Sequence, residues 1–150
     1  MAETGMKPAS LTTILRRHPA TIGDLWHARL FVLKPLVFTT LSFFWVTTGL
    51  ITLTAGHEAA TALLRNAGFG AAAPLAATAG GVLDLVIGVL ASIRRTVSLA
   101  LGAMIVVSLA YLLAVTWLLP SLWADPLGPL VKVVPIVLLT LVAAVILPSR

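Results

Sequence analysis

The apolar run at residues 71–95 constrains the fold more than any other part of the sequence. It closes on two arginines and contains a single carboxylate, Asp84. An α-helix rises about 1.5 Å per residue, which places Asp84 roughly 15 Å along the helix from Arg94. Because the hydrocarbon core of a bilayer is about 30 Å thick, the run predicts a transmembrane helix with an acid near the middle of the membrane.

Small residues surround Asp84 on one face of this predicted helix. Larger residues, namely Leu83, Val86, Ile87 and Leu90, are expected to turn elsewhere. Faces of small residues let transmembrane helices approach closely, and close packing is a main source of association energy in lipid. We therefore expect this face to contact other spans. Its members recur at three- and four-residue spacing: Ala77, Gly80, Gly81, Asp84, Gly88 and Ser92.

The composition supports a membrane protein and excludes several other classes. Hydrophobic residues make up 59% of the chain and charged residues 10%, whereas soluble domains carry about 25% charged residues. The chain contains no cysteine, which excludes disulfides, thiolate nucleophiles and cysteine-ligated metals within it. Nucleic-acid binding is not expected despite a net charge of +5, because no basic patch is interleaved with exposed aromatics.

Four apolar runs predict an all-α fold, a four-helix transmembrane bundle with a short interfacial helix at the N-terminus. Residues 1–32 are expected to form a polar and amphipathic segment, cytoplasmic and interfacial, and residues 33–150 the membrane domain. The predicted spans are residues 33–54, 71–95, 97–119 and 130–147, and the two longer reversals are residues 56–70 and 120–129.

Three local signals refine this plan. Thr21 and Asp24 could cap a helix in the N-terminal segment. Pro35 is expected in the first turn of the first span, where a missing N–H costs little. Residues 58–64 are expected to form a short amphipathic helix that ends at the glycine-containing sequence 66–68.

The basic residues predict the orientation of the bundle. With four spans, one side of the membrane holds eight of the ten Lys and Arg residues and the other side only Arg65 and Lys132. Positive charge favours the cytoplasmic side, so both termini should be cytoplasmic. The eight residues are Lys7, Arg16, Arg17, Arg29, Lys34, Arg94, Arg95 and Arg150.

A set of short motifs covers nearly the whole chain, from about residue 24 to residue 147. The most specific is residues 122–132, Leu-Trp-Ala-Asp-Pro-Leu-Gly-Pro-Leu-Val-Lys. With these motifs the chain resembles the DoxX-like membrane proteins, most closely the branch often found as the membrane portion of short-chain dehydrogenase-like or epimerase-like proteins. The other matching positions are Trp26, Arg29-Leu30, Leu33-Lys34-Pro35, Phe44-Trp45, Gly49-Leu50, Asp84-Leu85, Gly88, Tyr111 and Pro135.

The resemblance implies a four-helix membrane bundle and a link to redox chemistry. Some members of the wider family are linked to quinone-coupled sulfur oxidation or to membrane-associated redox complexes. This chain departs from the fused branch because it carries no dehydrogenase domain. No GxGxxG motif opens a βαβ unit, since residues 68–81 lead into a membrane helix. Any hydride chemistry would have to come from a separate protein.

Asp84 is the first candidate site residue. An ionisable residue at mid-membrane costs at least about 2.5–3.5 kcal/mol on insertion scales, so it usually faces the interior and has a partner. The functional interpretation is a proton or quinone site. The structural interpretation is a hydrogen-bonding group that pairs with Trp45, Ser108 or Tyr111. The sequence leaves both open.

Lys132 is the second candidate, a few residues into the fourth predicted span. It could snorkel to the surface and form a salt bridge with Asp125, or contact an anion or a quinone headgroup. Pro135 has no N–H for the carbonyl of Val131, which predicts a free acceptor beside Lys132. The residues considered for cofactor contact are Asp84, Lys132, Tyr111 and Trp45.

No catalytic or metal-binding residue can be assigned. The three histidines, His18, His27 and His57, lack the spacing of a metal site, and no histidine shares the depth of Asp84. We expect a small inner-membrane subunit or anchor in a bacterium, not an autonomous enzyme. Its expected partners are the lipid bilayer and an oxidoreductase on the cytoplasmic face, and a homo-oligomer is possible. The chain itself is expected to hold no cofactor, and a quinone is the one cofactor considered. A proton-coupled solute transporter and a purely structural protein are the alternatives.

Overall fold

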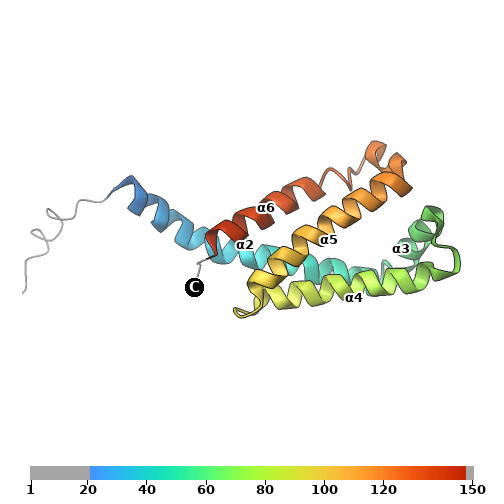
Figure 1. Cartoon of the computed structure of the whole chain (residues 1–150), viewed down its shortest axis with the longest axis horizontal. Helices are drawn as coiled ribbons and strands as arrows, with labels where there is room; N and C mark the ends of the chain where they lie inside the picture. Colours follow the sequence, from blue (N-terminus) through green and yellow to red (C-terminus); the bar gives the residue numbers. More distant parts are fainter. Residues whose placement is uncertain (1–20, 148–150) are drawn as a thin grey trace, which may run out of the picture. The chain divides into compact units, whose positions relative to one another are not determined.

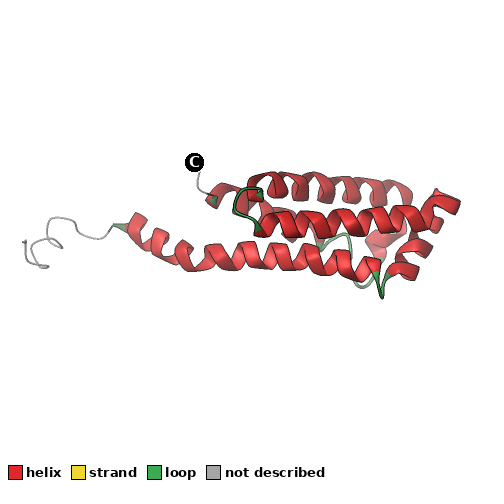
Figure 2. Ribbon diagram, turned by 90° about the horizontal axis from the view of Figure 1, so that it is seen from below, coloured by secondary structure: helices red, strands yellow, loops and turns green. Residues whose placement is uncertain are grey.

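The computed structural model describes residues 21–147, and all secondary structure within that range is helical (Figures 1 and 2). The predicted all-α membrane bundle is thereby confirmed for this part of the chain. The chain divides into two units, Met1–Leu33 and Lys34–Arg150, which are described separately. Five expected cytoplasmic residues lie outside the described residues: Lys7, Arg16, Arg17, His18 and Arg150.

Helix α2 (Ile22–Leu53) begins at the predicted cap, but it is one continuous helix of 32 residues, where a short helix and a separate span from residue 33 were expected. The Thr21 N–H donates to Asp24 Oδ2 at 2.8 Å, and the Asp24 N–H donates to Thr21 Oγ1 at 3.3 Å. This reciprocal pair satisfies two N–H groups that have no partner inside the helix. The helix then continues through Pro35, which was expected in a first turn but lies inside α2. Pro35 falls inside the helix because the helix starts 13 residues before it. Since proline has no N–H, one backbone hydrogen bond to the Phe31 carbonyl is missing.

The first reversal contains the predicted short helix. Helix α3 (His57–Leu64) is followed by one π-helical turn, η1 (Arg65–Phe69), and one 3₁₀ turn, η2 (Gly70–Ala72). The helical conformation breaks at Gly68, with φ of 92°, and Gly70 also has a positive φ of 53°. Only glycine adopts these conformations without steric cost, so the predicted stop near residue 68 is confirmed.

Helices α4 (Ala73–Ser92) and α5 (Val97–Leu118) pack against each other and are joined by a turn that carries Arg94 and Arg95. At about 1.5 Å per residue, helices of 20 and 22 residues are long enough for the hydrocarbon core. Three helical stretches in the described chain are long and apolar enough to cross a membrane: Ile22–Leu53, His57–Ser92 and Val97–Leu118.

The last predicted span is shorter as a helix than the sequence indicated. After the turn η3 (Pro120–Ala124), residues up to Lys132 form further turns, and α6 (Val133–Ile146) has 14 residues. This corresponds to about 21 Å of helix. The prolines and Gly128, with φ of 57°, explain why residues 130–132 do not extend the helix. Helix α6 packs along α5 (Figure 1).

The core of the second unit lies among α2, α4, α5 and α6. Its largest members are Leu41, Trp45, Leu101 and Met104, each exposed by 3% or less. Ile87 also belongs to this core, with 3% exposure, although the sequence suggested that it turns away from the packed face. The prediction was wrong because α4 contacts helices on two sides, which makes its buried surface wider than one stripe of small residues.

Candidate functional site

Glycines bring the backbones of α2 and α4 into direct contact. A methyl group added at Gly49 would lie 2.6 Å from the Leu85 nitrogen and 2.7 Å from the Gly81 oxygen. One added at Gly88 would lie 2.6 Å from the Val46 nitrogen. Backbone atoms cannot move aside as a flexible side chain can, so this contact requires glycine. The predicted role of the small face, close packing against another span, is confirmed.

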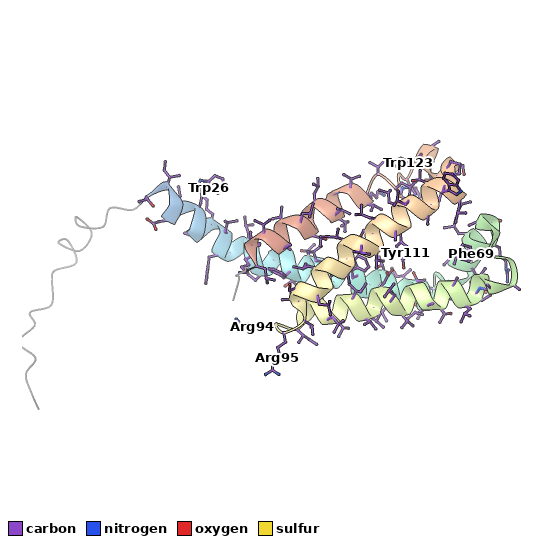
Figure 3. All side chains as sticks on the ribbon, in the orientation of Figure 1. Trp26, Phe69, Arg94, Arg95, Tyr111 and Trp123 are labelled. Atoms are coloured by element: carbon purple, nitrogen blue, oxygen red, sulfur yellow. The ribbon has the colours of Figure 1, made fainter. Side chains whose placement is uncertain are left out.

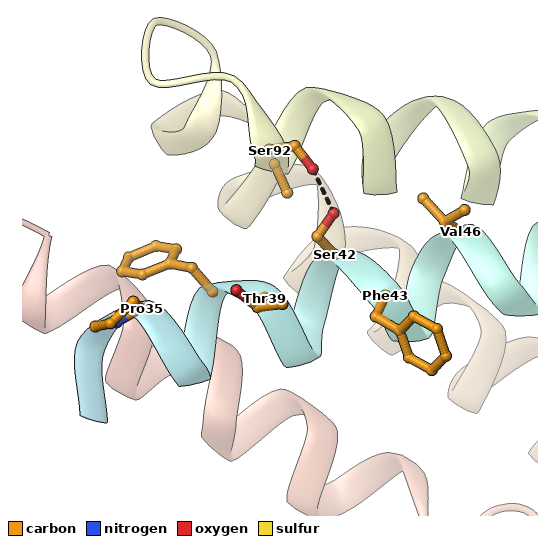
Figure 4. A pocket seen from close by; sticks show the side chains of 8 residues that line it. Pro35, Thr39, Ser42, Phe43, Val46 and Ser92 are labelled. Atoms are coloured by element: carbon orange, nitrogen blue, oxygen red, sulfur yellow. Dashed lines mark hydrogen bonds between the residues drawn. The ribbon is translucent and has the colours of Figure 1, made fainter. Parts of the chain in front are cut away.

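Two serines join the same pair of helices by hydrogen bonds. Ser42 Oγ donates to the Gly88 carbonyl at 2.7 Å, and it lies 2.6 Å from Ser92 Oγ (Figure 4). The Gly88 carbonyl is thus bonded across the helix interface in addition to its role inside α4. The sequence placed Ser92 on the packed face but gave no partner for it, because the period of α4 says nothing about the rotation of α2.

Asp84 pairs with Tyr111 across the α4–α5 interface. The Tyr111 hydroxyl donates to Asp84 Oδ1 at 3.3 Å, and Figure 3 marks Tyr111 on the side of α5 that faces α4. Gly80 makes room for the hydroxyl, because a methyl group there would lie 3.3 Å from the Tyr111 oxygen. Of the three partners that the sequence allowed for Asp84, the structure selects Tyr111.

The Asp84–Tyr111 pair lies where the interior of the bundle becomes accessible. Along the inner face of α5, exposure rises from 0% at Met104 to 7% at Ser108 and 40% at Tyr111. Asp84 itself is half-buried. An O–H···O bond normally spans about 2.5–3.0 Å, so a pair at 3.3 Å is loosely joined. The hydroxyl can therefore be redirected to another acceptor without breaking a strong bond.

Trp45 lies in the core and does not bond to Asp84. It is 3% exposed, it contacts Phe44 edge to face with ring centroids 6.5 Å apart, and its Cβ lies close to Gly88. Its indole Nε1 has no hydrogen-bond partner among the described residues. A core position suits packing better than contact with an exchangeable ligand.

Lys132 lies apart from the other candidates, immediately before α6, and is exposed. Within residues 21–147 it forms no salt bridge with Asp125, whose Oδ1 instead accepts the Leu127 N–H at 2.8 Å. The acceptor that Pro135 was expected to leave free is also occupied, because the Val131 carbonyl accepts the Val134 N–H at 3.3 Å. Since α6 starts at Val133, Pro135 falls in a first turn and costs no helical bond.

A basic cavity that the sequence did not single out lies at the end of the bundle that carries the α4–α5 turn. It measures about 730 Å³, and its three cations come from α2 and from that turn. The basic residues were used in the sequence only to orient the chain, because nothing there places Lys34 beside a turn 60 residues later. The cavity is lined by Lys34, Phe38, Ala91, Ser92, Arg94, Arg95, Val97, Ser98, Ala144 and Leu147.

No group of three or more His, Asp or Glu side chains in residues 21–147 could hold a metal ion. His57 Nδ1 lies 3.3 Å from the Thr52 carbonyl oxygen, at the start of α3. His18 and the side chain of His27 lie outside the described part. The chemistry available at Asp84–Tyr111 is hydrogen bonding and proton exchange.

Comparison with known proteins gives a family assignment. The family model of the DoxX-like family matches residues 42–141, which include α4, α5, both reversals and the Asp84–Tyr111 pair. No curated protein and no solved structure matches the chain. The family match covers two thirds of the sequence and agrees with the all-helical bundle. This small membrane protein therefore belongs to the DoxX-like family.

Proposed function

We propose that the protein is a small integral membrane subunit that works with a separate oxidoreductase and holds the polar ring of a quinone at Asp84–Tyr111. The observation that carries the proposal is the loosely joined hydroxyl–carboxyl pair, accessible at the level of the spans. A quinone ring presents carbonyl oxygens, which accept hydrogen bonds, and the Tyr111 hydroxyl is a donor that can turn toward one of them.

The surroundings of the pair suit a flat apolar ring with polar edges. Pockets for small molecules are mostly apolar with a few placed polar groups. Gly80 accommodates the Tyr111 hydroxyl beside α4, and the ring of Tyr111, which is 40% exposed, supplies an aromatic surface. Trp45 and Lys132, which the sequence also suggested, would take no part, because one is in the core and the other precedes α6.

The oxidoreductase would dock at the end that carries Lys34, Arg94 and Arg95. These cations lie at one end of the bundle, and a basic surface steers acidic partners toward it. We propose that this end is cytoplasmic and that the membrane is the inner membrane of a bacterium. The chain itself would position the quinone, and the electrons would come from the partner.

The test is a purification in mild detergent from the native membrane, followed by mass spectrometry of proteins and lipids. Wild-type protein should retain an oxidoreductase and a quinone, whereas Asp84→Leu and Tyr111→Phe should lose the quinone but keep the partner. Thr78→Val is the matched control, because Thr78 is exposed on the same helix and bonds only to the Pro74 carbonyl of that helix.

A transporter remains the second candidate, because an intramembrane acid also suits proton coupling. Liposomes that contain only this chain separate the two proposals. Proton-coupled uptake of a solute that is lost in Asp84→Asn, together with recovery of neither an oxidoreductase nor a quinone, would replace the redox proposal by the transporter.

A further inference from the structure

We propose that the basic end of the bundle is a binding site for one anionic phospholipid, with the phosphate among Lys34, Arg94 and Arg95 and one acyl chain along α2. This inference does not depend on the proposed redox function, because it requires only the bilayer. It rests on two neighbouring cavities that share the lining residues Phe38, Ala91 and Ser92.

The first cavity suits an anionic headgroup. Helices α2, α4, α5 and the end of α6 all contribute to it, and its volume of about 730 Å³ falls in the roughly 300–1,000 Å³ range of small-molecule sites. Among the described residues its lining includes three cations and no carboxylate, while Ser98 adds a hydroxyl donor. Basic pockets between transmembrane helices favour anionic lipid headgroups, because phosphate is both charged and a strong acceptor.

The second cavity suits an acyl chain. It is a groove of about 540 Å³ that runs beside α2, and most of its lining is apolar (Figure 4). Its two serine hydroxyls are bonded to each other at 2.6 Å and are therefore partly satisfied, which lowers the cost of an apolar occupant. The lining residues are Pro35, Phe38, Thr39, Ser42, Phe43, Val46, Ala91 and Ser92.

The combination selects a phospholipid over a free anion. Inorganic phosphate would use the cations but leave the apolar groove empty, and an uncharged lipid would use the groove but not the cations. Only a molecule with a phosphate joined to a hydrocarbon chain contacts both cavities. Arg94 and Arg95 project from the turn at the end of the helices (Figure 3), where headgroups are expected in a bilayer.

Native mass spectrometry of the full chain, released from vesicles, tests the site. Vesicles contain equal amounts of dioleoyl phosphatidylglycerol and dioleoyl phosphatidylcholine, which differ in headgroup charge but not in chains. We expect one phosphatidylglycerol to remain bound per chain. Each cation near an anionic surface contributes about a factor of five, so Arg94→Gln/Arg95→Gln should weaken retention roughly thirtyfold. Equal retention of the two lipids would overturn the proposal.

Three controls test whether weaker lipid retention reflects loss of the site, loss of general surface attraction or loss of an anion site alone. Arg65→Gln removes an exposed cation in η1, away from the cavity, and should leave retention unchanged; an equal loss would mean general surface attraction and would overturn the site. Thr39→Trp fills the groove without changing charge and should weaken retention. An excess of glycerophosphoglycerol, which is phosphatidylglycerol without its acyl chains, should not displace the lipid; displacement would mean an anion site only.

The variants are checked for folding by their thermal midpoints in detergent. Arg94 and Arg95 are exposed and lie in a turn, so their replacement should leave the midpoint unchanged. Should the double variant unfold, Lys34→Gln serves in its place, with an expected loss of roughly fivefold. The preference of the wild-type chain for phosphatidylglycerol over phosphatidylcholine needs no variant and stands as an independent measurement.

Discussion

Helix α4 contacts α2 and α5 in two different ways. Toward α2 it presents Gly88, and α2 presents Gly49 toward it; at both glycines the opposite backbone lies so close that no side chain fits. Toward α5 it presents Asp84, which meets Tyr111 through side-chain atoms at 3.3 Å in a partly accessible region. One face of the helix therefore provides rigid packing, and the adjacent face provides an adjustable polar pair.

A short membrane bundle can thus combine close helix packing with a polar site. Packing energy between transmembrane helices comes mainly from close approach of small residues. Close backbone approach occurs at the α2–α4 contact, whereas Asp84 and Tyr111 meet through side-chain atoms at the α4–α5 contact. The comparison predicts that changes on the two sides of α4 differ in size and in kind.

The largest effect is expected from filling the α2–α4 contact. Gly49→Ala and Gly88→Ala should each lower the free energy of unfolding by about 1–3 kcal/mol, because a methyl group would overlap backbone atoms at 2.6 Å. Gly102→Ala is the matched control, since nothing lies within 4 Å of a methyl group there. Reversible unfolding in mixed micelles measures all three. An unchanged Gly88→Ala protein would contradict the tight contact.

A smaller effect is expected at the polar pair. Asp84→Leu leaves the Tyr111 hydroxyl without its acceptor and should cost about 0.6–1.7 kcal/mol, the range of hydrogen bonds between membrane helices. Asp84→Asn should be nearly neutral, because the amide oxygen still accepts that bond. The double-mutant cycle of Asp84→Leu with Tyr111→Phe measures the coupling directly. Strictly additive effects of the two substitutions would show that the pair contributes no coupling.

Ser42→Ala should cost about 0.6 kcal/mol, because its hydroxyl bonds to the Gly88 carbonyl across the interface. Ser92→Ala should cost less, since Ser42 keeps its bond of 2.7 Å when Ser92 is removed. The bond from Ser92 to the same carbonyl measures 3.5 Å and is at the limit of a hydrogen bond. Thermal midpoints in detergent rank the two variants, and the reverse order would contradict this assignment.

The predicted orientation of the chain in the membrane is tested by labelling, and no change in stability is expected. Single cysteines at positions 66 and 95 can be introduced because the chain has none of its own. The excess of basic residues at one end predicts that position 66 is labelled from outside intact cells and position 95 only after permeabilisation. The opposite labelling pattern would show that the bundle has the inverse orientation, with the proposed docking end outside the cytoplasm.

Much of the fold follows from patterns that act along the chain. The Thr21–Asp24 cap and the stop at Gly68 depend on local backbone chemistry, and both were predicted correctly. Pro35 and the start of α6 were placed wrongly, because hydropathy gives the extent of an apolar run and not the residue at which a helix begins. Asp84 was recognised as the candidate acid because a carboxylate in an apolar run is costly wherever the helix turns.

From its residues alone the chain is recognised as a helical membrane protein, with Asp84 within a span and small residues around it. These properties depend on hydrophobicity and helical period, which are local. Only the tertiary structure decided that Tyr111 is the partner of Asp84, that Gly49 and Gly88 meet opposite backbones, and that Lys34 shares a cavity with Arg94 and Arg95. These contacts depend on which spans are neighbours and on the rotation of each helix about its axis, and neither is encoded in a repeat along one chain.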